Sequence, residues 1–237
     1  MTAVFTYKEP SYRIYEVNTD QKAWIKRAIE GARKVGYSTA LYTDSESFAE
    51  GLDLDETHFI SDEYTLWDSF KIYVLENRSG NDYFLCDNDC VFHNRLEFSD
   101  DIDLYFDGFE VDIWHNYYKP TLNLLESKGL FNYPFWSKDE VGVTNIGILK
   151  INNEELKRRY IHYWKRSYNL VKEFKSEFSK IGLTATISQF LLTKIMTSMN
   201  SSYKCFTTEK HYSNWSESNK YYRHYRGYLK VKKQSLI

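Results

Sequence analysis

The sequence predicts an α/β protein in which helices flank a mostly parallel central sheet. Three observations support this fold class. Short runs of β-forming residues alternate with stretches of helical periodicity through the first third of the chain. Polar residues follow the predicted strands, as they do where strands deliver side chains to the edge of a sheet. The length of 237 residues suits one well-filled domain rather than two full ones.

The first predicted elements are a strand, a helix and a second strand. The strand is expected at residues 4–7, and Thr19 or Asp20 is a suitable cap for the helix that follows. In that helix, QKAWIKRAIEGARKVG, apolar residues recur at helical spacing, and Gly36 is expected to end it. The β-forming run YSTALYTD then predicts the second strand.

The next elements lead to a pair of aspartates. A short strand is expected at THFI, followed by a helix that begins after Ser61 and covers DEYTLWDSFKIYVLEN. After the turn RSGND, the apolar run YFLC predicts a buried strand that leads directly into Asp87 and Asp89. Since sites of parallel sheets lie at the carboxyl ends of the strands, this pair is expected at the functional edge.

The second half of the chain is expected to complete the sheet and add two helices. Strands are predicted within residues 104–114 and 141–151, separated by a Pro-bearing loop at 119–134. A long helix is expected from Asn153 to a stop at Gly182, and a second one at residues 186–196. From Tyr203 onward an excess of Lys and Arg indicates a local positive surface, suited to a diphosphate, an anionic acceptor or a lipid phosphate.

Composition excludes several protein classes. A formal net charge of −2 and a pI near 6.3 give no general reason for binding polyanions. No apolar run approaches the ~20 residues of a membrane span, which leaves only a peripheral membrane contact. The start of the chain lacks the layout of a signal peptide, and the three cysteines are an odd number, so we expect a reduced, cytoplasmic protein. Cys86 and Cys90 are interpreted as structural cysteines rather than zinc ligands.

The aspartate pair supports more than one interpretation. Carboxylates are the ligands that Mg²⁺ and Mn²⁺ prefer, so Asp87 and Asp89 could hold a divalent ion, although Asp-x-Asp is also common in polar turns. The segment FLCDNDCV also resembles the motif of haloacid-dehalogenase-type phosphatases, in which Asp87 would be the nucleophile. That motif normally lies on the first strand of its family, whereas here several elements precede it, so the phosphatase is the alternative hypothesis.

A second motif far downstream favours a different family. The segment HYRGYLK contains a His-x-x-Gly-x-x-Lys pattern at His224, Gly227 and Lys230. Together with the Asp-x-Asp pair and the strand segment TNIGIL, it resembles the retaining glycosyltransferases of family 8, which have the GT-A fold. The resemblance implies a single Rossmann-like GT-A domain over residues 1–237. Its nucleotide-sugar half would cover 1–92 and its acceptor half 93–237.

The resemblance implies roles for particular residues. Asp87, Asp89 and His224 would bind Mn²⁺ (or Mg²⁺), and Lys230 and Gln189 would join the two aspartates as catalytic residues. Donor binding is expected from Tyr7, Lys71, Asn88, Asn145, Gly147, Gly227 and Lys230. Lysines on helix faces are more often solvated, so the sequence by itself favours an exposed Lys71. The chain departs from the family at Ser188, where relatives often carry an acidic residue before the glutamine.

The implied activity is a hexosyl or pentosyl transfer. A UDP-sugar would be the donor, and the acceptor hydroxyl would belong to a bacterial surface glycan or to a hydroxylated base in phage DNA. With no evident nucleophile in the sequence, we expect retention through attack on the same face, assisted by the departing phosphate. A catalytically silent relative that binds sugar or nucleic acid is a further alternative.

Overall fold

The computed structural model describes residues 1–8, 20–61, 66, 68–110, 118–129, 132–136, 142–173, 183–184, 186–207, 216–218 and 220–225. Its centre is a seven-stranded sheet with the order β3-β2-β1-β4-β7-β6-β8. β7 runs antiparallel to its neighbours β4 and β6, and the other adjacent pairs are parallel, which confirms the predicted α/β fold. The strands of this sheet are β1 (Thr2–Tyr7), β2 (Ser38–Thr43), β3 (Glu56–Phe59), β4 (Tyr83–Cys86), β6 (Leu104–Glu110), β7 (Val143–Ile151) and β8 (Tyr203–Cys205).

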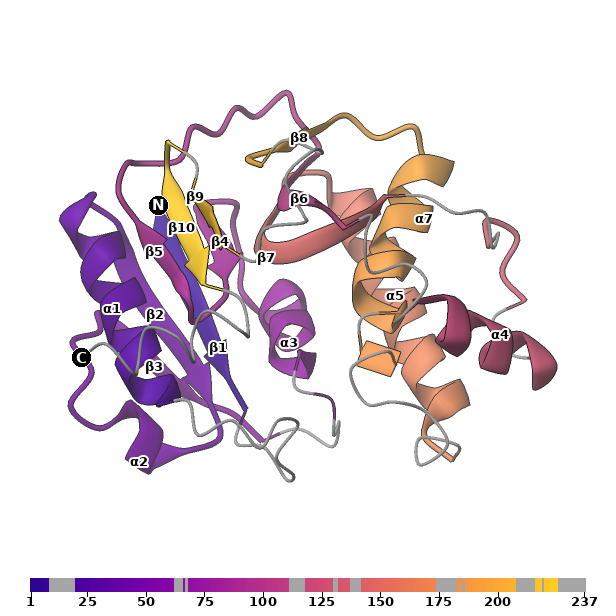
Figure 1. Ribbon diagram of the computed structural model, residues 1–237, viewed down its shortest axis with the longest axis horizontal. Helices are drawn as coiled ribbons and strands as arrows, with labels where there is room; N and C mark the ends of the chain where they lie inside the picture. Colours follow the sequence, from indigo (N-terminus) through magenta and orange to yellow (C-terminus); the bar gives the residue numbers. More distant parts are fainter. Residues whose placement is uncertain are drawn as a thin grey trace.

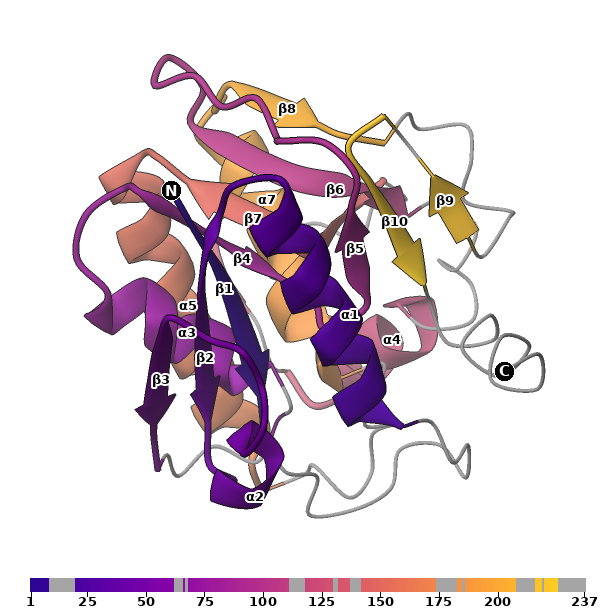
Figure 2. The same ribbon diagram turned by 90° about the vertical axis from the view of Figure 1, so that its left-hand side faces the viewer.

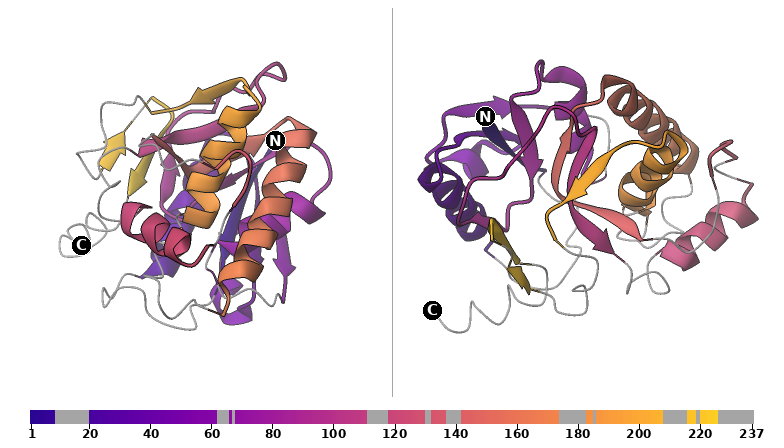
Figure 3. Two further views of the ribbon diagram at one scale, coloured as in Figure 1. Left: turned by 90° about the vertical axis from the view of Figure 1, so that its right-hand side faces the viewer. Right: turned by 90° about the horizontal axis from the view of Figure 1, so that it is seen from above.

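Helices cover both faces of this sheet (Figures 1 and 3). One face packs on α1 (Gln21–Lys34), and the other on α3 (Ser69–Asn77), α5 (Glu154–Val171) and α7 (Leu191–Ser198). Strand alternation divides the side chains between two hydrophobic cores: on β1, Phe5 enters the core beneath α1 and Val4 enters the opposite one. The remaining helices are α2 (Glu46–Ala49), α4 (Lys119–Ser127) and the π-helix η3 (Thr186–Phe190).

A second, three-stranded sheet lies beside α1 (Figure 2). It consists of β5 (Cys90–Phe92), β10 (Tyr222–Tyr225) and β9 (Ser216–Ser218), and β10 is the central strand. Gly31 of α1 permits the close contact with β5, because a Cβ there would lie 2.9 Å from the backbone nitrogen of Phe92. The sequence did not predict this sheet.

The predicted ends of α1 and the predicted start of α5 are confirmed by their capping residues. The Asp20 carboxylate accepts a hydrogen bond from the backbone N–H of Ala23 at 2.9 Å, and Gly36 has a φ of 84° just past the end of α1. The Asn153 side chain likewise accepts from Leu156 N–H at 3.0 Å at the start of α5. α5 ends at Val171, and the expected stop at Gly182 lies outside the described residues.

Two predicted boundaries were wrong. The Pro-bearing segment contains the helix α4, because Pro120 occupies its first turn, where a missing N–H costs nothing, and Leu122 and Leu125 are buried. α3 begins at Ser69, and Leu66 and Asp68, which belong to the helix expected after Ser61, are not helical. Residues 62–65 and 67 lie outside the described residues. In the part of the chain that is described, no helix has both the length and the apolar character of a membrane span.

Candidate functional site

The candidate site lies where the chain order of the strands reverses. β1 has β2 on one side and β4 on the other, so the carboxyl ends of β1 and β4 border the crevice in which α/β proteins bind ligands. Asp87 directly follows β4, and Tyr7 ends β1 with its ring stacked on Phe48 at 3.3 Å between centroids. The backbone N–H of Asp87 donates to the Gly147 carbonyl at 2.7 Å, which ties this position to β7.

Lys71 forms a buried ion pair with the first aspartate. Its Nζ lies 2.5 Å from Asp87 Oδ1 and donates to the Ile146 carbonyl at 2.7 Å. The residue is 4% exposed, so the expectation of a solvated lysine was wrong. Burial would lower the pKa of Lys71, but the Asp87 carboxylate outweighs this effect and holds that pKa above its ordinary value. The ammonium is therefore a fixed positive charge beside Asp87.

An irregularity in β7 provides the acceptor for this lysine. The register of β6 against β7 shifts between Phe106 and Gly108, whose partners are Leu149 and Asn145. The intervening residues of β7 therefore leave the regular ladder, and the Ile146 carbonyl becomes the acceptor for Lys71 Nζ. Neighbouring Gly147 accepts from the backbone N–H of Asp87, which continues the antiparallel pairing of β4 with β7. Two consecutive carbonyls of β7 thus accept hydrogen bonds from the two members of the ion pair.

A third buried charged group lies next to this pair. Asp68 precedes α3, and its Oδ2 accepts a hydrogen bond from the Ser188 hydroxyl, which itself accepts from Trp164 Nε1 at 2.9 Å. Burial raises the pKa of Asp68 to about 7, in spite of the lowering effect of the Ser188 hydrogen bond. Ser188, where the chain departs from the pattern of family 8, therefore contacts the carboxylate of Asp68, which lies outside its own helix. Asp68 and Trp164 were not among the predicted site residues.

A second polar group connects the ends of β6 and β7 to η3. Asn145 Nδ2 donates to Glu110 Oε1 at 2.5 Å, and Asn145 Oδ1 accepts from the Gly147 N–H at 2.8 Å. The Tyr118 hydroxyl lies 2.7 Å from Glu110 Oε2 and 2.9 Å from Gln189 Oε1. The structure thus places the predicted residues Asn145, Gly147 and Gln189 in one hydrogen-bonded group. Sequence reasoning missed Glu110, whose signal is an acidic residue within the predicted strand at 104–114.

The aspartate pair occupies a tight turn between β4 and β5. The backbone N–H of Cys90 donates to the Asp87 carbonyl at 3.1 Å, which closes the turn. Asp89 is 5% exposed. The buried Oδ1 of Asn88 has no hydrogen-bond partner among the described residues. An orphaned polar atom of this kind is a group that a bound ligand or water can satisfy.

The small sheet brings a distant part of the chain to this turn. His224 in β10 pairs with Cys90 in β5, so the His224 backbone lies across from the residue that follows Asp89, with Cα atoms about 5 Å apart. The Tyr222 hydroxyl donates to Asp107 Oδ1, which also accepts from Thr207 Oγ1 at 2.9 Å, and this anchors β10 to the main sheet. The His224 side chain, Gly227 and Lys230 lie outside what the structure describes.

The donor groups near the turn can be compared with what a divalent cation needs. The described part of the chain contains no group of three His, Cys, Asp or Glu side chains arranged for a metal. Two carboxylates in one turn match the oxygen donors that Mn²⁺ and Mg²⁺ prefer, and a histidine would extend the donor set toward Mn²⁺. Lys71 occupies one lone-pair direction of the Asp87 carboxylate, which can accept about four hydrogen bonds or metal contacts in all.

The cysteines beside the aspartates are not chemically active groups. Cys86 and Cys90 are free and buried, and burial raises the pKa of both thiols well above the ordinary value. Cys90 Sγ donates to the Gly147 carbonyl at 3.6 Å, and Cys86 Sγ donates to the Val4 carbonyl at 3.7 Å. They therefore act as packing residues of the sheet.

Comparison with known proteins gives no family assignment. No protein-family model matches the chain, and no curated protein matches it significantly.

Proposed function

We propose that this protein is a metal-dependent glycosyltransferase that transfers a sugar from a UDP-sugar to an acceptor hydroxyl with retention. One observation carries the proposal: the Asp87–Asp89 turn lies at the switch point of the sheet, and β10 pairs the His224 backbone with Cys90, next to Asp89. The aspartate turn and the backbone of His224, separated by more than half the chain, are thereby close together at the edge where α/β proteins bind ligands.

The three implied ligands would hold a Mn²⁺ ion at this turn. Asp87 and Asp89 supply carboxylate oxygens, and His224 would supply an imidazole nitrogen. When bound, such an ion neutralises the diphosphate and stabilises it as the leaving group. Lys71 orients the Asp87 carboxylate through the 2.5 Å ion pair. It also adds a positive charge near the site of the developing negative charge.

The second polar group suits the sugar. Gln189 and Asn145 have amides that can donate to and accept from hydroxyls, and Glu110 supplies a carboxylate held in place by Tyr118. Both oxygens of Glu110 are hydrogen-bonded, which favours a binding role over attack on the sugar. We therefore propose that the acceptor attacks from the same face as the departing phosphate, whose oxygen accepts the hydroxyl proton.

The acceptor and the cellular setting follow from the same proposal. We propose a bacterial surface glycan or a hydroxylated base of phage DNA as the acceptor, with the enzyme acting in the cytoplasm. A glycan acceptor predicts that transfer is insensitive to moderate salt, whereas a DNA acceptor predicts a steep loss of binding as salt increases.

The test is UDP release from a panel of UDP-sugars with and without Mn²⁺. We expect release with Mn²⁺ from at least one donor, and a loss of at least ~100-fold in Asp89→Asn, since both the metal and the diphosphate depend on that carboxylate. Asp100→Asn, at an exposed loop position, is the control and should retain wild-type turnover. An Asp89→Asn protein as active as wild type would contradict the proposal.

The alternatives give different results in the same experiment. Hydrolysis of an aryl phosphate with Mg²⁺ but no binding of any nucleotide-sugar would favour the phosphatase that uses Asp87 as a nucleophile. Saturable donor binding without turnover would favour a catalytically silent relative.

A further inference from the structure

Asp68 is a buried carboxylate that its own helix does not use. It occupies the N-cap position of α3 but makes no side-chain capping bond, and only 3% of the residue is exposed. Its Oδ1 is buried and has no hydrogen-bond partner among the described residues. A buried carboxylate that is only partly hydrogen-bonded costs folding free energy. Neither capping nor packing therefore explains why an acid occupies this position.

The other carboxylate oxygen connects α3 to the π-helix. Asp68 Oδ2 accepts from the Ser188 hydroxyl, and Trp164 Nε1 donates to that hydroxyl at 2.9 Å, which fixes the direction in which the hydroxyl points. The next residue in η3 is Gln189, whose side chain reaches Tyr118 at 2.9 Å. Its backbone carbonyl is held by the hydroxyls of Thr144 and Thr193, at 3.0 Å each. π-helices frequently mark functional positions, and here the neighbours Ser188 and Gln189 point to two different polar groups.

Asp68 also lies close to the lysine of the ion pair. It precedes Lys71 by three residues, and the backbone N–H of Lys71 donates to the Asp68 carbonyl at 3.0 Å. In its ionised form Asp68 adds its negative charge to that of Asp87 in stabilising the ammonium of Lys71. One carboxylate thus acts on the cation at the aspartate turn and, through Ser188, on the π-helix that carries Gln189.

We propose that Asp68 is a positioning residue that couples the two halves of the site. Through Ser188 it fixes η3 so that the Gln189 carboxamide faces the Glu110 group, and its charge keeps the Lys71 ammonium directed at Asp87. The proposal rests on the proposed glycosyltransferase activity. It explains an unfavourable buried charge as a feature retained for the geometry of the site.

The test is Asp68→Asn, which keeps an oxygen that can accept from Ser188, removes the charge and replaces Oδ1, which has no partner among the described residues, with an NH2 group. We expect kcat/KM for the UDP-sugar to fall about 10-fold or more, as for a displaced positioning group, while the unfolding midpoint stays the same or rises. A carboxylate with a merely structural role predicts the opposite pattern, in which stability falls and turnover per folded molecule is unchanged. Asp55→Asn is a control at an exposed position, because the Asp55 carboxylate also accepts hydrogen bonds, from Thr39, but lies at the far end of the strands.

A double variant in which Asp68 and Ser188 are exchanged separates the effect of the lost charge from the effect of local structural damage. Asp68→Ser alone should lose activity, and the double variant Asp68→Ser with Ser188→Asp, which places the carboxylate on the other side of the same hydrogen bond, should recover at least several-fold of it. The inference is overturned if Asp68→Asn has wild-type kcat/KM, or if the double variant is no better than Asp68→Ser. If the wild-type protein releases UDP from no donor, the proposed function fails and this inference fails with it. An active wild type with unaffected variants overturns the inference alone.

Discussion

At the scale of single residues, Lys71 and Asp87 form a largely buried ion pair at the candidate site. The two side chains are 5% and 23% exposed, so removing one charge leaves the other poorly solvated. We expect Lys71→Met to lower the free energy of unfolding by about 3 kcal/mol in urea titrations. Mn²⁺-dependent UDP binding should be lost as well.

The control for that prediction is another lysine ion pair. Lys165 Nζ lies 2.5 Å from Glu76 Oε1, but the side chains are 33% and 41% exposed, so Lys165→Met should cost less than about 1 kcal/mol. Equal losses of unfolding free energy in Lys71→Met and Lys165→Met would mean that the Lys71 ion pair has no special role.

Glu56 at the edge strand predicts a pH dependence of stability. The hydrogen bonds from Arg78 and then His58 lower the pKa of Glu56 from 4.5 to about 2 in the folded protein. Because the folded pKa lies below the unfolded one, the stabilisation is complete above pH 4.5 and is lost as the pH falls toward 2. The melting temperature of wild type should therefore be higher than that of Glu56→Gln at neutral pH. The difference between the two melting temperatures should disappear as the pH falls through this acidic range. A difference that is independent of pH would contradict the assignment.

The candidate site residues differ in how clearly the surrounding sequence indicates them. Asp87 and Asp89 were recognisable because polar residues directly follow an apolar run. Lys71 was not, since its burial depends on the bulge in β7, which is distant in sequence. The roles of Asp68 and Glu110 likewise depend on partners from other elements, Ser188 and Tyr118.

At the scale of elements, α1 packs closely against β5, the strand that follows the aspartate turn. Alanine normally stabilises a helix relative to glycine by about 1 kcal/mol. At Gly31, however, an added Cβ would meet Phe92 N at 2.9 Å and Phe92 O at 3.1 Å. We expect Gly31→Ala to destabilise the fold by about 1–3 kcal/mol and to weaken Mn²⁺-dependent UDP binding, because β5 directly follows Asp89.

Gly51→Ala provides the comparison for this variant. Nothing lies within 4 Å of a Cβ at Gly51, but its φ of 73° disfavours alanine. Stability should fall while UDP binding persists. If Gly31→Ala binds UDP as tightly as Gly51→Ala does, the contact between α1 and β5 does not shape the site.

The elements that the sequence predicted are the long and strongly patterned ones. Runs of β-forming residues mark β1 and β2, and helical spacing with a cap marks α1, so local rules were sufficient. β5, β8 and β9 are three-residue strands, too short to show a period, and they form only because a partner strand is available. A proline between two strands usually indicates a loop, but Pro120 occupies the first turn of the helix α4, where it is compatible with a helix.

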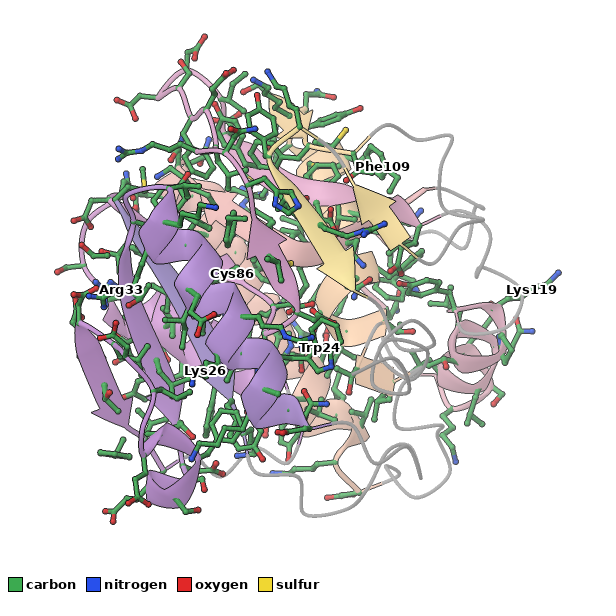
Figure 4. The ribbon with its side chains drawn as sticks, turned by 60° about the vertical axis from the view of Figure 1, so that its left-hand side comes forward. Trp24, Lys26, Arg33, Cys86, Phe109 and Lys119 are labelled. Atoms are coloured by element: carbon green, nitrogen blue, oxygen red, sulfur yellow. The ribbon has the colours of Figure 1, made fainter. Side chains whose placement is uncertain are left out.

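At the scale of the whole molecule, the fold brings polar residues from distant parts of the chain together near the carboxyl ends of β4 and β6. The alternation of strands and helices was sufficient to predict the α/β class and the edge at which Asp87 lies. The antiparallel insertion of β7 between β4 and β6 could not be predicted, since it depends on pairing between distant segments. Figure 4 shows the breadth of the molecule: Arg33 on α1 and Lys119 on α4 lie at opposite sides.

The central claim is that the aspartate turn and His224 form one metal-dependent UDP site. The most direct measurement is calorimetric titration of UDP into wild type, Asp89→Asn and His224→Ala, each with and without Mn²⁺. We predict saturable UDP binding to wild type that requires Mn²⁺ and raises its unfolding midpoint by mass action, and at least a tenfold loss of affinity in both variants. UDP binding that is the same without Mn²⁺, or unchanged in both variants, would contradict the claim.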